Sequence, residues 1–307
     1  MLSLLSLTAA IVSPGGNVLV VGSGPVLICA AKLAAIKGFT TTALLFPEEC
    51  QAAKALIYDK KTEEGSIPLT FMPIAGPDAN EETIEKLAAE SEGLILALDN
   101  EKTFGAPVLE TFLKPGGALK RVSMMSRYLN GGGMGFFVKS AKFAANTEIW
   151  DANADAVAAY KAMENIVSTK AMAAGAEYTV IRAGTLKGGA TGSSLSDAGG
   201  GGEPTLLTPA FYKLGAQDVA NWRLIYDCDA LGVNLVAGDT LPGPGNSAVF
   251  TATAKVGAGD SHRGAVAASL VEALRAPKAG NRDFSIAAEE GRDFPDDAGW
   301  AAKFAAA

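Results

Sequence analysis

Histidine and cysteine are scarce in this chain of 307 residues. The one histidine is His262, and the three cysteines, Cys29, Cys50 and Cys228, are far apart and follow no metal-ligand spacing. Metal chemistry of the histidine-rich kind is therefore excluded, and a Ser-His-Asp triad would have to use His262. We also expect no disulfide framework.

Basic clusters and long apolar runs are missing as well. The formal net charge is -7 and no Lys/Arg cluster offsets it, so we expect no nucleic-acid partner. No apolar run reaches the roughly 20 residues of a transmembrane helix. The N-terminal arm, residues 1–16, is apolar up to residue 12 with no basic residue before it. A packed or extended arm and the tail end of a targeting segment both remain open.

Strand and helix patterns alternate along most of the chain. Apolar and β-branched runs predict strands over residues 18–21, 40–46, 69–72, 94–98, 119–125, 178–182 and 283–287. Helices are expected over residues 26–37, from 47 onward, and over 81–90, 104–113, 151–174 and 263–275. This alternation predicts an α/β protein with a Rossmann-type, doubly wound, mostly parallel sheet.

The same patterns suggest how the chain is divided. Residues 17–190 form the predicted dinucleotide-binding domain. Residues 191–260 are a Gly/Pro-rich, irregular C-terminal insertion that would shape a substrate or partner region. Residues 261–307 contribute a closing helix and strand of the same fold, followed by a tail.

A glycine turn, Gly22-Ser23-Gly24, follows the first predicted strand, and Pro25 with Val26 opens the next helix. Glycines here allow a pyrophosphate to approach backbone amides at a helix N-terminus. The third glycine of the usual pattern is replaced by Leu27. The turn predicts dinucleotide binding, with a Rossmann-shaped protein that has lost its ligand as the alternative.

The residue that ends the second strand usually selects the cofactor, an acid favouring NAD and a base favouring NADP. Here that strand ends at Phe46, and Glu48 and Glu49 come later, where they would act as partners of the helix dipole. The sequence therefore does not choose between NAD and NADP. We place Phe46 in the candidate cofactor site together with Ala97 and Leu98, which end the fourth strand.

Three later motifs point to a family. Lys161 and Glu164 lie three apart on the long helix, the sixth strand ends in Arg182-Ala183-Gly184, and Ser261-His262-Arg263 opens the closing helix. In this order they resemble the NAD(P)-binding, NmrA-like branch of the atypical short-chain dehydrogenase/reductase family. The resemblance covers roughly residues 17–190 and 260–288.

The resemblance assigns roles to several residues. It implies that Lys161 hydrogen-bonds the nicotinamide ribose and that Ser126, with Ser123 as second choice, polarises a substrate carbonyl. The family's catalytic tyrosine stands four residues before the lysine, where this chain has Val157. Tyr160 is adjacent to Lys161 and points about 100° away from it on a helix. It therefore cannot simply take the place of the family's catalytic tyrosine.

Arg182, at the carboxyl end of its strand, would either reach a phosphate or ribose or form a structural salt bridge. The resemblance implies two classes of function. One is a reductase that transfers hydride between NAD(P) and a small carbonyl or alkene. The other is a non-catalytic Rossmann subunit or assembly factor of a plastid thylakoid or mitochondrial membrane complex. Because members of that family often occur in plastids, the resemblance implies an organelle, a plastid above all, with the cytoplasm as the alternative.

Overall fold

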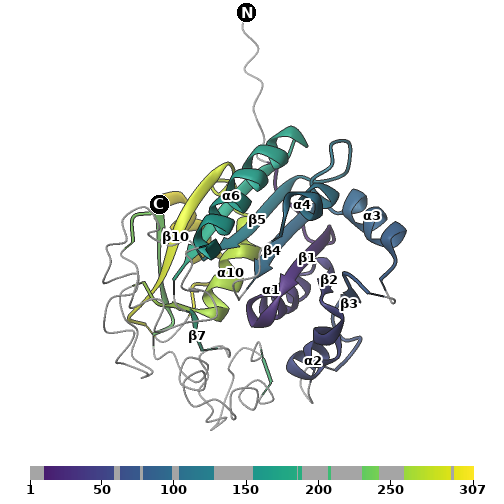
Figure 1. Ribbon diagram of the computed structural model, residues 1–307. Coiled ribbons are helices and arrows are strands. Elements are labelled where there is room, and N and C mark those ends of the chain that lie inside the picture. The colour runs from purple at the N-terminus through teal and green to yellow at the C-terminus, as the bar shows by residue number, and fades with distance from the viewer. Residues whose placement is uncertain are drawn as a thin grey trace, which may run out of the picture.

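An eight-stranded sheet with helices on both faces organises the chain (Figure 1). The structure is a computed structural model that describes residues 10–58, 63–76, 79–98, 104–127, 155–184, 186–188, 207–208, 230–241, 259–291 and 294–307. The strand order is β3-β2-β1-β4-β5-β6-β10-β8. All neighbouring pairs are parallel except β10 and β8, which run antiparallel. The predicted doubly wound, mostly parallel α/β fold is confirmed.

The strands of this sheet are β1 (Asn17–Ser23), β2 (Thr40–Leu45), β3 (Leu69–Pro73), β4 (Gly93–Leu98), β5 (Arg121–Ser126), β6 (Glu177–Ala183), β8 (Gly232–Ala237) and β10 (Arg282–Glu289). A second, two-stranded ladder pairs β7 (Leu186–Lys187) with β9 (Ser261–His262). The central strands β4 and β5 are buried along their whole length, as strands covered on both faces must be.

The helices divide between the two faces of the sheet. One face is covered by α1 (Gly24–Ile36), α2 (Pro47–Ile57) and α10 (Arg263–Ala273), with α11 (Asp297–Ala306) beside α10. The other face is covered by α3 (Glu81–Glu90), α4 (Ala106–Phe112) and α6 (Asp155–Ala173). Each layer encloses its own apolar cluster, so the sheet lies between two cores.

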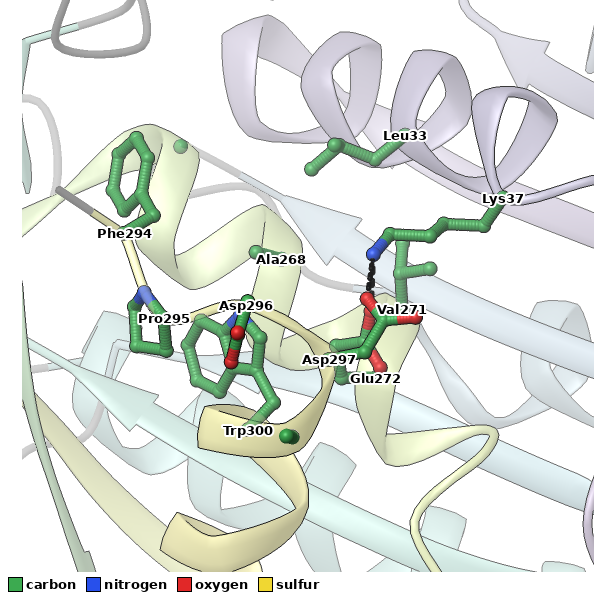
Figure 2. A pocket seen from close by; sticks show the side chains of 12 residues that line it. Leu33, Lys37, Ala268, Val271, Glu272, Phe294, Pro295, Asp296, Asp297 and Trp300 are labelled. Atoms are coloured by element: carbon green, nitrogen blue, oxygen red, sulfur yellow. Dashed lines mark hydrogen bonds and ion pairs between the residues drawn. The ribbon is translucent and has the colours of Figure 1, made fainter. Parts of the chain in front are cut away.

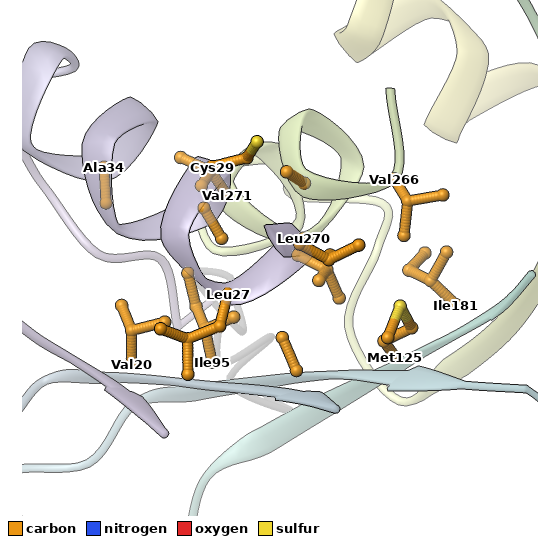
Figure 3. Packing of buried hydrophobic residues seen from close by; sticks show 14 of the residues in the cluster. Val20, Leu27, Cys29, Ala34, Ile95, Met125, Ile181, Val266, Leu270 and Val271 are labelled. Atoms are coloured by element: carbon orange, nitrogen blue, oxygen red, sulfur yellow. The ribbon is translucent and has the colours of Figure 1, made fainter. Parts of the chain in front are cut away.

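Leu27, which replaces the third glycine of the dinucleotide pattern, is fully buried in the first of these cores. Figure 3 shows it beside Val20 of β1 and Ile95 of β4, with Leu270 of α10 across from it. In the usual pattern the third glycine serves close helix–strand packing. Here a leucine side chain fills that space, so α1 is held on the sheet by an apolar contact instead.

Gly22 allows β1 and β4 to come unusually close. Its φ is +150°, and a Cβ atom built there would lie 1.7 Å from the carbonyl oxygen of Ala97. The two strands stay in register through this point, with Gly22 opposite Ala97 and Ser23 opposite Leu98. The glycine is therefore required by the sheet itself, whatever the site above it binds.

At the amino end of β5, Arg121 joins segments that are far apart in sequence. Its buried guanidinium donates to the carbonyl oxygens of Ala10 (3.2 Å) and Ala276 (3.4 Å) and pairs with Glu177 at 2.6 Å. Val12 is also buried. The described part of the N-terminal arm, from residue 10 onward, thus packs on the fold, and residues 1–9 lie outside the described residues.

Several elements differ from the sequence prediction. The strand β8 lies inside the stretch predicted to be irregular, and α11 lies inside the predicted tail. Both elements have only two buried apolar residues each that mark them, Val233 and Leu235 in β8 and Trp300 and Phe304 in α11. Such short patterns identify a strand or helix only after their burial is known. Most of residues 191–260 lie outside the described residues, and the domain limits stay predictions.

The close approach at Gly22 predicts a large cost for Gly22→Ala. The added Cβ would collide with backbone, so we expect a loss of about 3 kcal/mol in the free energy of unfolding, measured by urea denaturation. Gly116→Ala is the matched control, because Gly116 also has positive φ (+87°) but open space around it. It should lose only about 1 kcal/mol. Equal losses would contradict a steric role for Gly22.

Candidate functional site

The candidate site lies at the carboxyl edge of the sheet, where the strand order reverses between β1 and β4. Open α/β sheets bind ligands in the crevice at such a switch point. The structure brings the predicted residues of the turn together with the end of β4, because Ser23 is opposite Leu98. Phe46 follows directly after β2, the other neighbour of β1.

Ser23 and Gly24 form the junction between β1 and α1. Gly24 has φ +81°, which favours glycine, and Pro25 in the first turn has no N–H to donate. Ser23 is the N-cap residue, but its side chain accepts no hydrogen bond from the helix. Its Oγ is fully buried and has no hydrogen-bond partner. The start of α1 therefore combines a positive helix end with an unsatisfied hydroxyl.

A cavity of about 670 Å³ lies between the end of β2, the segment after β3, and helices α3 and α4. Phe46 and Phe104 contribute aromatic walls, and Ile74 and Ile84 add aliphatic ones. Among the lining residues that the structure describes, Glu81 supplies the one charged side chain. The volume is typical of pockets for small organic ligands. Its position next to β2 suits the adenosine half of a dinucleotide bound across β1.

The predicted catalytic residues lie on the far side of the switch point. Ser126 ends β5, is fully buried, and stands opposite Arg182 of β6. Lys161 lies in the second turn of α6 with its side chain exposed. Val157 belongs to the first turn of the same helix. No contact among the described residues joins Lys161 to the start of α1.

Arg182 is held by two carboxylates. Its Nη2 lies 2.8 Å from Glu164 Oε2, and its Nη1 pairs with Asp283. Burial lowers the pKa of Arg182, but the hydrogen bonds and charges of Glu164 and Asp283 outweigh that effect and leave it above its usual value. Of the two roles considered for Arg182, the structure displays the salt bridge. Two carboxylates against one guanidinium leave this cluster without net positive charge.

Tyr160 points into the protein, as the helical geometry predicts. Its phenol donates to the carbonyl oxygen of Leu98 at 3.1 Å, and the side chain is buried. Leu98 ends β4 at the switch point, so this bond fixes α6 against the strand that borders the candidate site. The neighbouring residue Lys161 is consequently directed outward.

Sequence reasoning missed two buried cations at the carboxyl edge. Arg127 follows β5 and donates twice to the carbonyl oxygen of Gly184, at 2.8 and 3.1 Å, which joins the ends of β5 and β6. Lys187 of β7 pairs with Asp260 at 2.7 Å, and both side chains are buried. A basic residue directly after an apolar strand was the available signal for Arg127.

His262 caps a helix and packs against an aromatic ring. Its Nδ1 accepts from the N–H of Gly264 and caps α10, and its ring packs edge-on against Phe294 with centroids 5.0 Å apart. In the part of the chain that the structure describes, no group of His, Cys, Asp or Glu residues could hold a metal ion. No described helix is long and apolar enough to cross a membrane.

A second cavity, of about 410 Å³, lies away from the carboxyl edge between α1, α10 and the segment that leads into α11 (Figure 2). Lys37 pairs there with Asp297 and with Glu272 at 3.1 Å. Burial lowers the pKa of Lys37, but these carboxylates outweigh it and raise it overall. Asp296 accepts from the N–H of Gly299 and caps α11. The polar groups of this cavity thus satisfy one another.

The Tyr160 bond predicts a specific loss of stability. Tyr160→Phe leaves the buried Leu98 carbonyl without that donor, which we expect to cost about 2 kcal/mol in the free energy of unfolding, measured by urea denaturation. Tyr178→Phe, at the half-buried start of β6, should change it by less than about 0.5 kcal/mol. If both variants are equally stable, the Tyr160 bond does not hold α6 in place.

Comparison with known proteins supports the fold. No family model and no curated protein sequence matches this chain. A short-chain dehydrogenase/reductase from Veillonella parvula, solved in complex with NADP, aligns over 92% of this chain and 99% of its own, with 12% identity and a TM-score of 0.51. The oxidoreductase ylbE from Lactococcus lactis aligns over 94% and 95%, with 12% identity and a TM-score of 0.51.

Identity this low establishes shared architecture rather than shared chemistry. The strand order, the α1 junction and the two solved structures agree on that architecture, so the resemblance suggested by the sequence is confirmed at the level of the fold. This chain has the Rossmann-type fold of the short-chain dehydrogenases/reductases.

Proposed function

We propose that this protein binds a nicotinamide dinucleotide across the carboxyl edge of its sheet. The observation that carries the proposal is the Ser23 hydroxyl, which is fully buried at the start of α1 without a partner. Such a hydroxyl costs about 1–3 kcal/mol when left unsatisfied. A diphosphate oxygen at the helix N-terminus would accept its hydrogen bond. The V. parvula protein with this fold was solved with NADP.

The residues present fit such a ligand. The start of α1 at Gly24 would hold the diphosphate, because the positive φ of Gly24 and its lack of a side chain leave the backbone accessible. Phe46 and the cavity beside it would take the adenosine half. Ala97 and Leu98 at the end of β4 would form the floor of the crevice, and Lys161 would bind the nicotinamide ribose, the role that the family resemblance implies.

When bound, a nicotinamide cofactor supplies hydride to an electrophilic carbon, and the proposed reaction is reduction of a small carbonyl or alkene. Ser126 would donate a hydrogen bond to the substrate oxygen, which stabilises the negative charge that develops there. The protein must also provide a proton. Val157 cannot do so, and the family's tyrosine would have stood at that position.

This gap favours a second candidate function, a non-catalytic Rossmann subunit or assembly factor of a membrane complex in a plastid or mitochondrion. Two measurements separate the candidates. A reductase consumes NADH or NADPH in the presence of some member of a panel of small aldehydes, ketones and enones. A subunit binds the dinucleotide without consuming it and co-purifies with a membrane complex through detergent and high salt.

Replacing Ser23 tests the binding site directly. Ser23→Ala removes an unsatisfied buried hydroxyl, so we expect unchanged or higher stability of the unliganded protein and about tenfold weaker dinucleotide binding, measured by fluorescence titration. In Ser123→Ala the lost hydroxyl donates to Leu270 O at 2.8 Å. That control should lose about 1 kcal/mol of stability and keep its affinity. A Ser23 variant with full affinity would argue against the diphosphate site.

Lys161 can be tested against a second lysine of the same helix. Lys161→Ala should weaken dinucleotide binding about tenfold, since a charge-assisted hydrogen bond to the ribose is lost. Lys170→Ala removes an equally cationic side chain that pairs instead with Glu110 at 2.7 Å, and it should bind normally. Calorimetric titration of both variants gives the comparison. Normal affinity in the Lys161 variant removes that residue from the site.

A further inference from the structure

We infer that the cavity between α1, α10 and the segment that leads into α11 binds a neutral, apolar small molecule with the size of about two fused rings. This cavity lies beside the last turn of α1, whereas the proposed dinucleotide site lies at the first turn of that helix. The two sites are therefore separate. Three features of the cavity support a ligand of this kind: its size, its walls and the pairing of the charges at one end.

The size of the cavity is that of a ligand site. Its volume is about 410 Å³. Protein interiors are close-packed, and voids larger than a water molecule are few in each domain. An apolar cavity of roughly 150 Å³ already stays dry and binds benzene, and pockets for organic ligands begin near 300 Å³. The cavity beside α1 therefore has room for more than one ring.

The apolar walls come from three parts of the chain and are held in place by contacts outside the cavity (Figure 2). The ring of Trp300 packs against Phe304, with centroids 6.3 Å apart, and the ring of Phe294 packs edge-on against His262 at 5.0 Å. Because these aromatic rings are fixed by their neighbours, a ligand would not have to order them. The apolar residues of the described lining are Leu33, Ala268, Val271, Phe294, Pro295 and Trp300.

The charged side chains at the other end pair with one another. Lys37 pairs with Asp297 and lies 3.1 Å from Glu272. Arg275, next to the cavity, approaches the same carboxylates, at 3.2 Å for Asp297 and 3.4 Å for Glu272. A charged ligand would lose its hydration and would have to compete with these partners. Asp296 is exposed to water, where an ion pair contributes little. The cavity therefore favours a neutral ligand.

The driving force follows from the same lining. A neutral ligand that enters this cavity removes its own apolar surface and that of the walls from water, which is favourable without any charge pairing. Burial of apolar surface gives a negative change in heat capacity on binding. It also makes affinity insensitive to moderate salt, since no exposed ion pair contributes.

The test is a calorimetric titration of the full chain with three naphthalene derivatives that share one ring system and differ in their substituent: a methanol, a carboxylate and a methylammonium. We expect the alcohol to bind at least about fivefold more tightly than either ion, with a negative change in heat capacity. If the alcohol does not bind, or if either ion binds as tightly, the inference is wrong. Dinucleotide affinity, titrated in parallel, tests the proposed function alone.

Two variants that fill the cavity from opposite walls test the location. Ala268→Leu on α10 and Leu33→Phe on α1 should each weaken binding of the alcohol at least about tenfold and leave the thermal midpoint of unfolding unchanged or higher. The two variants are used together so that overpacking in one leaves the other to decide.

The matched control is Ala302→Leu. It adds the same atoms as Ala268→Leu at an exposed position of α11 outside the described lining, so it should bind the alcohol normally. If a folded filling variant keeps full affinity, or if the control loses as much affinity, the alcohol binds elsewhere and the inference fails.

Discussion

The contact between Gly22 and the carbonyl of Ala97 is the constraint on which the site depends. Only a residue without a side chain lets β1 stay paired with β4 up to their last residues. Ser23 and Gly24 are thereby placed at the edge of the sheet, opposite the end of β4. The crevice at the switch point and the start of α1 both follow from this one approach of two backbones.

Helix α6 has a buried face that packs on the sheet and an exposed face that carries Lys161. Tyr160, Met163 and Val167 turn into the core and hold the helix on the sheet, while Lys161 points outward. The inward residues preserve the scaffold whatever happens at Val157. The packing of α6 on the sheet and the chemistry available on its outer face can therefore vary independently of each other.

Much of the fold could be predicted from sequence, because its signals are local. The β-branched run before Gly22 and the apolar run that ends at Leu98 identify central strands without any knowledge of the rest. A salt bridge at Arg182 was one of two predicted roles, but its partner Asp283 could not be identified, since it lies 101 residues away. The unsatisfied state of the Ser23 hydroxyl also escaped prediction, because the glycine turn indicates where a ligand binds but not which atoms lack partners. The apolar patterns of β8 and α11 are too short to predict these elements from sequence. They were recognised only once the structure showed which of their residues are buried.

The Arg121 cluster has a consequence for how the protein unfolds. Its guanidinium bonds to Ala10 and Ala276, which lie 111 and 155 residues away along the chain, so these bonds close very large loops. Contacts of such long range carry the full entropic cost of loop closure and tend to form after local structure. We therefore expect them to stabilise the native state more than the transition state for folding. Such contacts slow unfolding rather than speed folding, which makes Arg121 a determinant of the lifetime of the native state.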